Sequence, residues 1–179
     1  MQDLSKFSLP KNFRGRSAIY VQLWWIVDVI FFRPSPQIFY KWRRFLLRLF
    51  GAKIGKNVII RPSVTVTYPW KVEIGDNSWI GDDVVLYSLG EIKIGRNTVI
   101  SQKSYICAGT HDYKQEDFPI LSKEVIIEDE CWLATDVFIG PGVRIYEGTV
   151  VGARSSVFKD IPARKVCMGS PVEIIKDRV

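Results

Sequence analysis

Aliphatic side chains recur at every sixth position through most of this chain, in five groups of three. They are Ile54, Ile60, Val66, Ile74, Ile80, Leu86, Ile94, Ile100, Ile106, Ile127, Leu133, Ile139, Ile145, Val151 and Val157. A short fixed repeat is typical of a solenoid, in which each strand stacks on its counterparts in the neighbouring coils. Three units of six residues close one triangular coil. The repeat therefore predicts a parallel β-helix of about five triangular coils, with the aliphatic side chains pointing inward.

Two further positions of the repeat predict how each coil bends. Glycine directly follows the aliphatic residue at six places, which are Gly55, Gly75, Gly81, Gly95, Gly140 and Gly152. The residue four places after the aliphatic position is mostly small or β-branched. We expect the glycines to supply the unusual φ angles that corners need, because glycine has no Cβ. We expect the small residues to fit where the chain bends and space is tight.

The repeat has one long interruption, at residues 112–126, between the third and fourth coils. Loops longer than about twelve residues inside a compact domain are usually functional. His111, the only histidine of the chain, stands at the root of this interruption. We therefore expect His111 to be catalytic and residues 112–126 to form an active-site loop.

The first 53 residues differ from the repeat in charge and in apolar pattern. They contain ten Lys and Arg against two Asp, a net charge of +8, interleaved with large apolar side chains. The spacing predicts two helices, over 19–31 and 37–50, that cap the open end of the solenoid. Trp and Phe beside Arg also fit a peripheral contact of residues 19–50 with an anionic membrane surface. The apolar run over 19–32 is too short to span a bilayer.

Several classes of protein are excluded by composition. The three cysteines, Cys107, Cys131 and Cys167, form no disulfide framework, and no apolar signal segment opens the chain, so we expect a cytoplasmic protein. One histidine cannot supply the three that a γ-class carbonic anhydrase needs for zinc, and we expect no metal. The basic residues alternate with apolar ones at helical spacing, without a nucleic-acid-binding motif, so we expect no nucleic-acid partner.

Four blocks of sequence occur in an order and spacing that match a known family. They are CWLA at 131–134, IGPGV at 139–143, VGARSSVFKDIP at 151–162 and GSP at 169–171. Through them the chain resembles the acetyl-CoA-dependent O-acetyltransferases of the hexapeptide-repeat family, which act on galactosides, maltose, nodulation factors or streptogramins. The segments at 86–89, 100–105 and 110–112 are most similar to the acetyltransferases of colanic-acid biosynthesis. The resemblance covers about residues 54–175, and it implies a left-handed coil and a homotrimer.

The resemblance also implies a role for His111. It would be the general base that takes a proton from an acceptor hydroxyl as this attacks the thioester of acetyl-CoA. One ring nitrogen must then be unprotonated, while the other needs an acceptor that fixes the tautomer. Asp112, Glu116, Asp117 or a backbone carbonyl could serve, and the sequence leaves these alternatives open.

Further site residues follow from the same resemblance. Ala134 and Thr135 would lie beside the reactive end of acetyl-CoA, Trp132 would wall its tunnel, and Gly152 and Ala153 would line the pantetheine arm. The candidates for the CoA phosphates are Lys159, Arg164, Lys165 and, as a weaker match, Lys176. The acceptor-binding asparagine of the galactoside and maltose enzymes has no clear equivalent. The candidates for the acceptor pocket are therefore Tyr87, Ser88 and Asp112.

The expected molecule has a cap at 1–53, a left-handed β-helix at 54–162 and a short tail at 163–179. It is expected to transfer acetyl groups to a sugar hydroxyl in exopolysaccharide biosynthesis, as a cytoplasmic homotrimer at the inner face of the membrane. Two alternatives remain open, namely an O-acetyltransferase of the streptogramin or xenobiotic type and a non-catalytic β-helix scaffold at the membrane surface. Turnover of acetyl-CoA with a glycan acceptor distinguishes an enzyme from a scaffold. An antibiotic-protection assay distinguishes the streptogramin type from a glycan enzyme.

Overall fold

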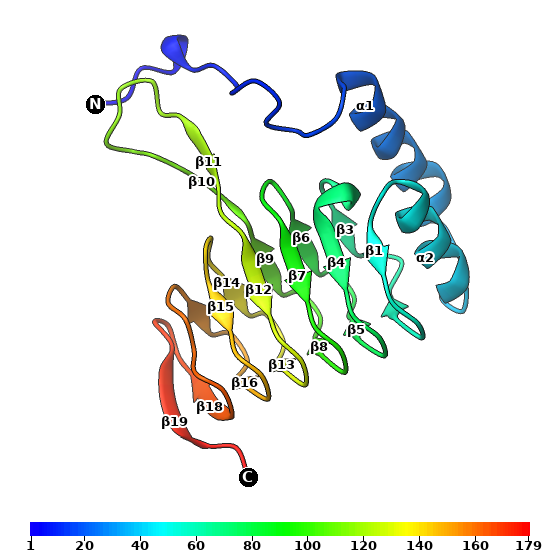
Figure 1. Cartoon of the computed structure of the whole chain (residues 1–179), viewed down its shortest axis with the longest axis vertical. Helices are drawn as coiled ribbons and strands as arrows, with labels where there is room; N and C mark the ends of the chain where they lie inside the picture. The colour runs from blue at the N-terminus through cyan, green and yellow to red at the C-terminus, as the bar shows by residue number, and fades with distance from the viewer.

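The six-residue repeat becomes three mainly parallel β-sheets in the computed structural model, which describes residues 1–179 (Figure 1). The first sheet contains β1 (Lys53–Ile54), β4 (Val72–Ile74), β7 (Ile92–Ile94), β12 (Val125–Ile127) and β15 (Arg144–Ile145). The second contains β2 (Ile59–Ile60), β5 (Trp79–Ile80), β8 (Val99–Ile100), β13 (Trp132–Leu133), β16 (Val150–Val151), β18 (Lys165–Met168) and β19 (Glu173–Asp177). The third contains β3 (Thr65–Val66), β6 (Val85–Tyr87), β9 (Tyr105–Cys107), β14 (Phe138–Ile139) and β17 (Ser156–Val157).

The aliphatic residues of the repeat pair with one another along the axis of the helix. In the first sheet Ile74 pairs with Ile54 and Ile94, and Ile127 pairs with Ile94 and Ile145. All fifteen repeat residues are buried and belong to one core cluster. The predicted fold is confirmed, because the chain forms a left-handed parallel β-helix. The expected C-terminal tail extends the β-helix, because β18 pairs with β16 as part of a sixth coil. The last strand, β19, runs antiparallel to β18.

The glycines of the repeat serve a purpose different from the predicted one. A Cβ on Gly75 would lie 2.7 Å from the backbone nitrogen of Arg96 in the next coil, so the glycine is required by the close stacking of coils. The left-handed backbone conformation falls two residues later, at Asn77, where φ is 60°. Asparagine tolerates this conformation better than most residues. The expectation that the glycines supply the unusual φ was therefore wrong for these positions.

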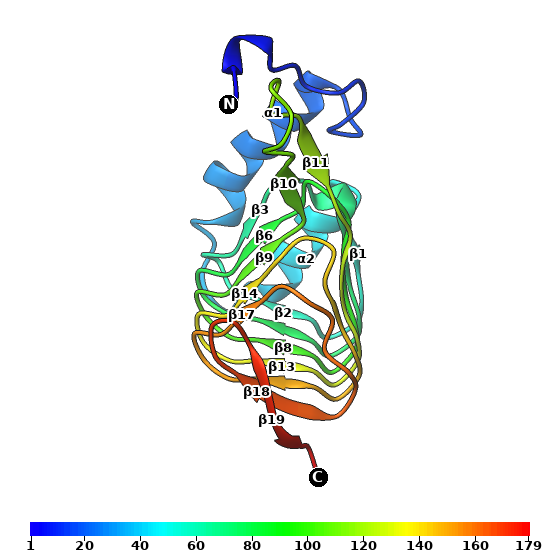
Figure 2. The same cartoon turned by 90° about the vertical axis from the view of Figure 1, so that its left-hand side faces the viewer.

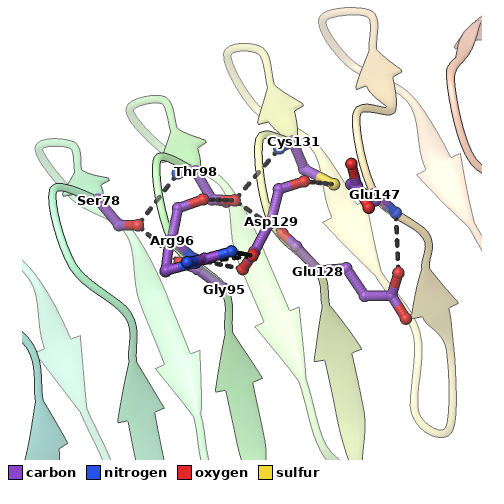
Figure 3. A network of polar contacts seen from close by, with 8 residues as sticks. All are labelled: Ser78, Gly95, Arg96, Thr98, Glu128, Asp129, Cys131 and Glu147. Atoms are coloured by element: carbon purple, nitrogen blue, oxygen red, sulfur yellow. Dashed lines mark hydrogen bonds and ion pairs between the residues drawn. The ribbon is translucent and has the colours of Figure 1, made fainter.

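Small polar side chains join successive coils through the core (Figure 3). The hydroxyl of Ser78 donates to the carbonyl of Gly95 at 2.6 Å and accepts from the amide of Thr98 at 3.0 Å. The hydroxyl of Thr98 in turn donates to the carbonyl of Glu128 at 2.7 Å and accepts from the amide of Cys131 at 3.2 Å. Burial raises the pKa of the Cys131 thiol to about 11, so the thiol stays protonated near neutral pH. The small polar residues of the repeat thus fit the tight space at the bends and also have partners for their buried hydroxyl groups.

Two helical segments cover the first coil, as predicted; the first spans the expected residues, whereas the second is shorter than expected. They are α1 (Ala18–Val27), which continues as a π-helical turn η2 (Asp28–Phe32), and α2 (Tyr40–Leu49). Short 3-10 turns occur at η1 (Leu4–Lys6) and η3 (Pro69–Lys71). No helix combines the length and the apolar character needed to cross a membrane.

Side chains from these helices donate hydrogen bonds to backbone carbonyls at the open edge of the first coil. The indole of Trp24 donates to the carbonyl of Val66 at 2.8 Å. The remaining donors are three arginines of α2, whose guanidinium groups bond to the carbonyls of Ile60 (Arg43, 2.7 Å), Val58 (Arg44, 2.6 Å) and Ile54 (Arg48, 2.7 Å). An uncovered edge of this kind is a template for pairing with other chains. The helices therefore terminate the solenoid by hydrogen bonding as well as by apolar packing.

Candidate active site

The interruption of the repeat is a β-hairpin that projects from the coils (Figures 1 and 2). It consists of β10 (Gly109–His111) and β11 (Ile120–Ser122), which pair antiparallel with His111 opposite Ile120. It leaves the solenoid where the third sheet leads into the first, and Val125 of β12 then pairs with Ile92. The expected active-site loop therefore contains a strand, and His111 lies on a strand at the base of the turn.

The turn of the hairpin is held by the carboxylate of Asp112. One carboxylate oxygen accepts from the amide of Lys114 at 3.0 Å, and the other accepts from the side chain of Gln115 at 2.8 Å. The bond from the Gln115 side chain and then the bond from the Lys114 amide hold the pKa of Asp112 below its ordinary value. Asp112 is thus ionised and fixes the turn beside His111.

The imidazole of His111 is fixed by Phe118, across the hairpin. Nδ1 lies 2.9 Å from the backbone carbonyl oxygen of Phe118, and the two rings stack with centroids 4.2 Å apart and planes 10° apart. A carbonyl only accepts hydrogen bonds, so Nδ1 carries a proton, and in the neutral imidazole Nε2 is then the nitrogen with the free lone pair. Of the alternatives that the sequence left open, the structure selects a backbone carbonyl. An imidazole held in this tautomer can accept a proton from a hydroxyl at Nε2.

The two remaining acceptor candidates, Tyr87 and Ser88, lie in very different surroundings. Tyr87 is half-buried on the outer face of the third sheet, in the apolar cluster that also contacts Ile120 of the hairpin. Ser88 is fully buried, and its hydroxyl accepts from the amide of Tyr68 at 2.8 Å and donates to the carbonyl of Tyr68 at 3.0 Å. Ser88 therefore joins two coils and cannot reach a substrate, which corrects its assignment to the acceptor pocket.

The candidates for contact with acetyl-CoA lie on other parts of the prism. Trp132 stands on the outer face of the second sheet, 48% exposed, and its indole donates to the hydroxyl of Ser101 at 3.1 Å. The remaining four lie at the corner between the second and third sheets, namely Ala134, Thr135, Gly152 and Ala153. His111 lies at a different corner, where the third sheet leads into the first, so one chain does not bring His111 and these four residues together.

The basic candidates follow the last coils. Lys159 and Arg164 are exposed and form no ion pair within the chain. Lys165 pairs with Asp177 across β18 and β19, and Lys176 is exposed on β19. The structure contains no cluster of three or more side chains that could hold a metal ion.

Residues 3–7 also lie against the hairpin, and the ring of Phe7 is 6.1 Å from that of His111. The sequence carried no signal for this contact, because Phe7 belongs to no repeat and to no predicted helix.

Comparison with known proteins places the chain among acetyltransferases, although no protein-family model matches it. It is 63% identical over 179 residues to WcaF of Escherichia coli K12, which is provisionally named as a colanic acid biosynthesis acetyltransferase, and the match covers 100% of this chain and 98% of WcaF. A maltose O-acetyltransferase of Clostridium difficile 630 superimposes with a TM-score of 0.82 at 25% identity, over 91% of this chain and 90% of that one. A hexapeptide-repeat acetyltransferase of Vibrio cholerae, solved with acetyl coenzyme A, gives a TM-score of 0.81 at 25% identity, over 91% of each chain.

Proposed function

The chain belongs to the hexapeptide-repeat acetyltransferase family that includes WcaF, and on this premise we propose that it transfers acetyl groups from acetyl-CoA to a sugar hydroxyl of an exopolysaccharide precursor. The name of WcaF supports the substrate class, and the Vibrio cholerae structure with acetyl coenzyme A supports the donor. The observation that carries the proposal is the Nδ1 bond of His111 to the carbonyl of Phe118, because it leaves Nε2 as a base.

His111 acts twice in the proposed reaction. Nε2 takes the proton of the acceptor hydroxyl while the hydroxyl oxygen attacks the thioester carbonyl, which forms the C–O bond. When the C–S bond breaks, His111 returns the proton to the sulfur, which gives the acetylated sugar and CoA with a free thiol. The carbonyl of Phe118 stabilises the imidazolium formed between these steps, because it keeps accepting from Nδ1.

We assign the donor side to a neighbouring copy of the chain. His111 and the corner that contains Ala134 and Gly152 lie on different edges of the prism, so a single chain holds two half-sites. A cyclic homotrimer places the hairpin of one copy beside the coils of the next. In this arrangement Trp132, Thr135 and Ala153 line the donor channel.

The exposed cations Lys159 and Arg164 would bind the phosphates of CoA, together with Lys165 and Lys176. On the acceptor side we retain Tyr87 and Asp112, with Asp112 acting through the shape of the turn.

The reaction is proposed to take place in the cytoplasm, at the inner face of the membrane. The outer faces of α1, η2 and α2, with the two residues before α2, expose large apolar side chains, which are Ile19, Leu23, Trp25, Ile26, Val29, Ile30, Phe31, Ile38, Phe39, Trp42, Phe45 and Leu49. Exposed Arg33 and Lys41 flank this apolar surface. Binding at a membrane interface grows with buried apolar area and with attraction to anionic lipids. The enzyme would bind a lipid-linked acceptor from the membrane at this end of the molecule.

Co-sedimentation with vesicles tests the membrane contact. The variant Ile26→Ser should lower binding to phosphatidylcholine–phosphatidylglycerol vesicles by roughly threefold, because it removes apolar area from the surface. Ile174→Ser is a matched control, since both side chains are 53% exposed and Ile174 lies on β19 at the other end of the chain. Equal binding of all three proteins would exclude the proposed surface.

The reaction is tested by the release of free thiol from acetyl-CoA with oligosaccharides that contain fucose, galactose or glucose. His111→Ala should lower acetyl transfer at least a hundredfold, within the range of about 10²–10⁴ for a general base. His111→Asn is a sharper variant, because an amide can still donate to the carbonyl of Phe118 but cannot take the proton. Lys114→Ala, an exposed change in the same hairpin, is the control and should keep normal turnover.

Equal rates for wild type and both His111 variants would overturn the assignment of the base. Transfer to xenobiotic acceptors alone would identify the streptogramin type of enzyme. Absence of acetyl-CoA binding would identify a scaffold.

A further inference from the structure

The N-terminal arm, residues 1–13, is anchored to the capped end of the solenoid. The ammonium group of Lys71 donates to the carbonyl of Phe13 at 2.7 Å, and the indole of Trp70 donates to the carbonyl of Arg14 at 2.7 Å. Lys71 also lies 5.2 Å from the ring centroid of Phe13. The base of the arm is therefore held by partly buried bonds between backbone carbonyls and two neighbouring side chains of the first coil.

The beginning of the arm is attached to the catalytic hairpin. The amide of Asp3 donates to the carbonyl of Glu116 at 2.7 Å, and the ammonium group of Lys6 lies 2.7 Å from the carboxylate of Glu116. The carboxylate of Asp3 accepts from the amide of Ser5 at 3.1 Å, which begins the turn η1 that places Lys6 and Phe7. The arm thus runs from the cap to the tip of the hairpin (Figures 1 and 2).

This path places Phe7 beside the catalytic base. Its ring centroid is 6.1 Å from that of His111, with the planes at 49°, while Phe118 stacks on His111 at 4.2 Å. The imidazole therefore has two aromatic neighbours, one from its own hairpin and one from the arm. Phe7 is 38% exposed, so part of its ring is free to contact a bound molecule.

We propose that residues 3–7 form a wall of the acceptor pocket and that Phe7 determines which sugars present a hydroxyl to His111. The proposal rests on the proposed function and deepens it. The donor-side residues lie at another corner of the prism, whereas the arm and His111 come from the same chain and are neighbours at the hairpin. Sugars carry apolar C–H faces between their hydroxyls, and an aromatic ring of this kind gives them an apolar surface with a defined orientation.

Glu116 is a positioning residue in this proposal, because it holds the arm rather than the substrate. Its ion pair with Lys6 is exposed, with side-chain exposures of 52% and 60%, and such pairs are weak and screened by salt. Reversal of one charge should therefore release the arm without unfolding the coils, and reversal of both should restore the attachment.

Chemical modification tests the position of Phe7 without any acceptor. His111 is the only histidine, so diethyl pyrocarbonate produces one imidazole signal near 240 nm that reports on this residue alone. Phe7→Ala and Glu116→Lys should each speed the modification at least threefold. The double variant Lys6→Glu/Glu116→Lys should return to the wild-type rate. Leu9→Ala is the matched control, because Leu9 lies in the same arm, is 42% exposed and contacts no residue of the hairpin through a hydrogen bond or ion pair.

Equal modification rates for Phe7→Ala and wild type would overturn the proposal, provided that circular dichroism shows equal folding. This result is independent of catalysis, so it separates failure of the arm assignment from failure of the proposed function.

Steady-state kinetics then test the acceptor side, with the sugar of the panel that gives the highest turnover. Phe7→Ala should raise the KM for this acceptor about tenfold, which is the lower end of the effect of one apolar contact on specificity. The KM for acetyl-CoA should stay unchanged. The ratio of kcat/KM between two sugars should change as well, which a purely structural role would not produce. A raised KM for acetyl-CoA with unchanged acceptor constants would place Phe7 on the donor side and contradict the proposal.

Discussion

At the scale of single residues, the cap contains one unfavourably placed carboxylate. Asp28 is 6% exposed; one of its oxygens pairs with Arg33 at 2.7 Å, and the other has no hydrogen-bond partner. Burial raises the pKa of Asp28 above its ordinary value, even though the hydrogen bond and the charge of Arg33 act in the opposite direction. The folded protein therefore takes up a proton at Asp28 at a higher pH than the unfolded chain does. Asp28 costs stability near neutral pH, and this cost begins to shrink as the pH falls through the raised pKa and is gone below the ordinary pKa of aspartate.

Asp28→Asn should accordingly stabilise the protein at pH 7 by about 1 kcal/mol, because a neutral amide loses less hydration on burial than a carboxylate. The difference from wild type should shrink as the pH is lowered and vanish below the ordinary pKa of aspartate. Urea unfolding at a series of pH values measures both effects. Parallel stability profiles for the two proteins would show that Asp28 is not the cause.

Single residues are also where the sequence was least informative about the site. It predicted a catalytic role for His111 from its place at the interruption, but the partner of Nδ1 depends on which residues face each other across the hairpin. That partner, Phe118, has a φ of 47° in a turn without glycine, which no local pattern predicts. Ser88 was misassigned for a related reason, because its position next to Tyr87 does not reveal that its side chain points into the core.

At the scale of elements, the corners of the coils repeat one backbone conformation with unequal side chains. The left-handed position is filled by asparagine in some units, such as Asn97 with φ 52°, and by long side chains in others, such as Lys103 with φ 63°. The left-handed conformation costs most residues roughly 1–2 kcal/mol, and asparagine is among the residues that tolerate it.

Lys103→Asn should therefore stabilise the protein by about 0.5–1 kcal/mol. The reverse change at an equivalent corner, Asn97→Lys, should destabilise it by a similar amount. Midpoints of urea unfolding measure both, and neither side chain forms an ion pair whose loss would confuse the comparison. A loss of stability in Lys103→Asn would contradict the argument from backbone conformation.

The elements were largely predictable because the repeat dictates which side chains face inward. A period of six fixes three short strands per coil, and the register of each sheet follows from stacking like residues on like. The role of the glycines was not predictable, since the repeat shows where glycine recurs but not whether a backbone angle or a neighbouring coil requires it. The spacing between coils at Gly75 and Gly95 answers this question.

At the scale of the whole molecule, stability depends on closing the open edge of the first coil. Arg43 is fully buried and donates to the carbonyls of Ile60, Pro36 and Gln37 and to the hydroxyl of Ser35. The sequence showed a basic amphipathic helix but could not show that Arg43, Arg44 and Arg48 point at backbone carbonyls. Much of the positive charge that suggested a membrane contact is therefore also structural.

Arg43→Met should destabilise the protein by roughly 3 kcal/mol, because it leaves buried carbonyls without donors. Lys41→Met, an exposed change in the same helix, should have little effect. Urea unfolding measures the loss, and light scattering should detect association of Arg43→Met, whose loosened cap leaves the edge open to other chains. An unchanged midpoint would show that α2 holds the edge by apolar packing alone.

The position of the cap before the coils in the sequence has a consequence for synthesis on the ribosome. Each coil pairs only with its neighbours, so a nascent chain can add coils in the order in which they emerge. Because α1 and α2 emerge before the coils and cover one edge, the growing solenoid offers newly made strands a single direction in which to extend. The N-terminal arm, in contrast, must wait until Glu116 has left the exit tunnel before it can attach. The wall beside His111 is therefore made from residues translated before any coil but is completed only after the third coil.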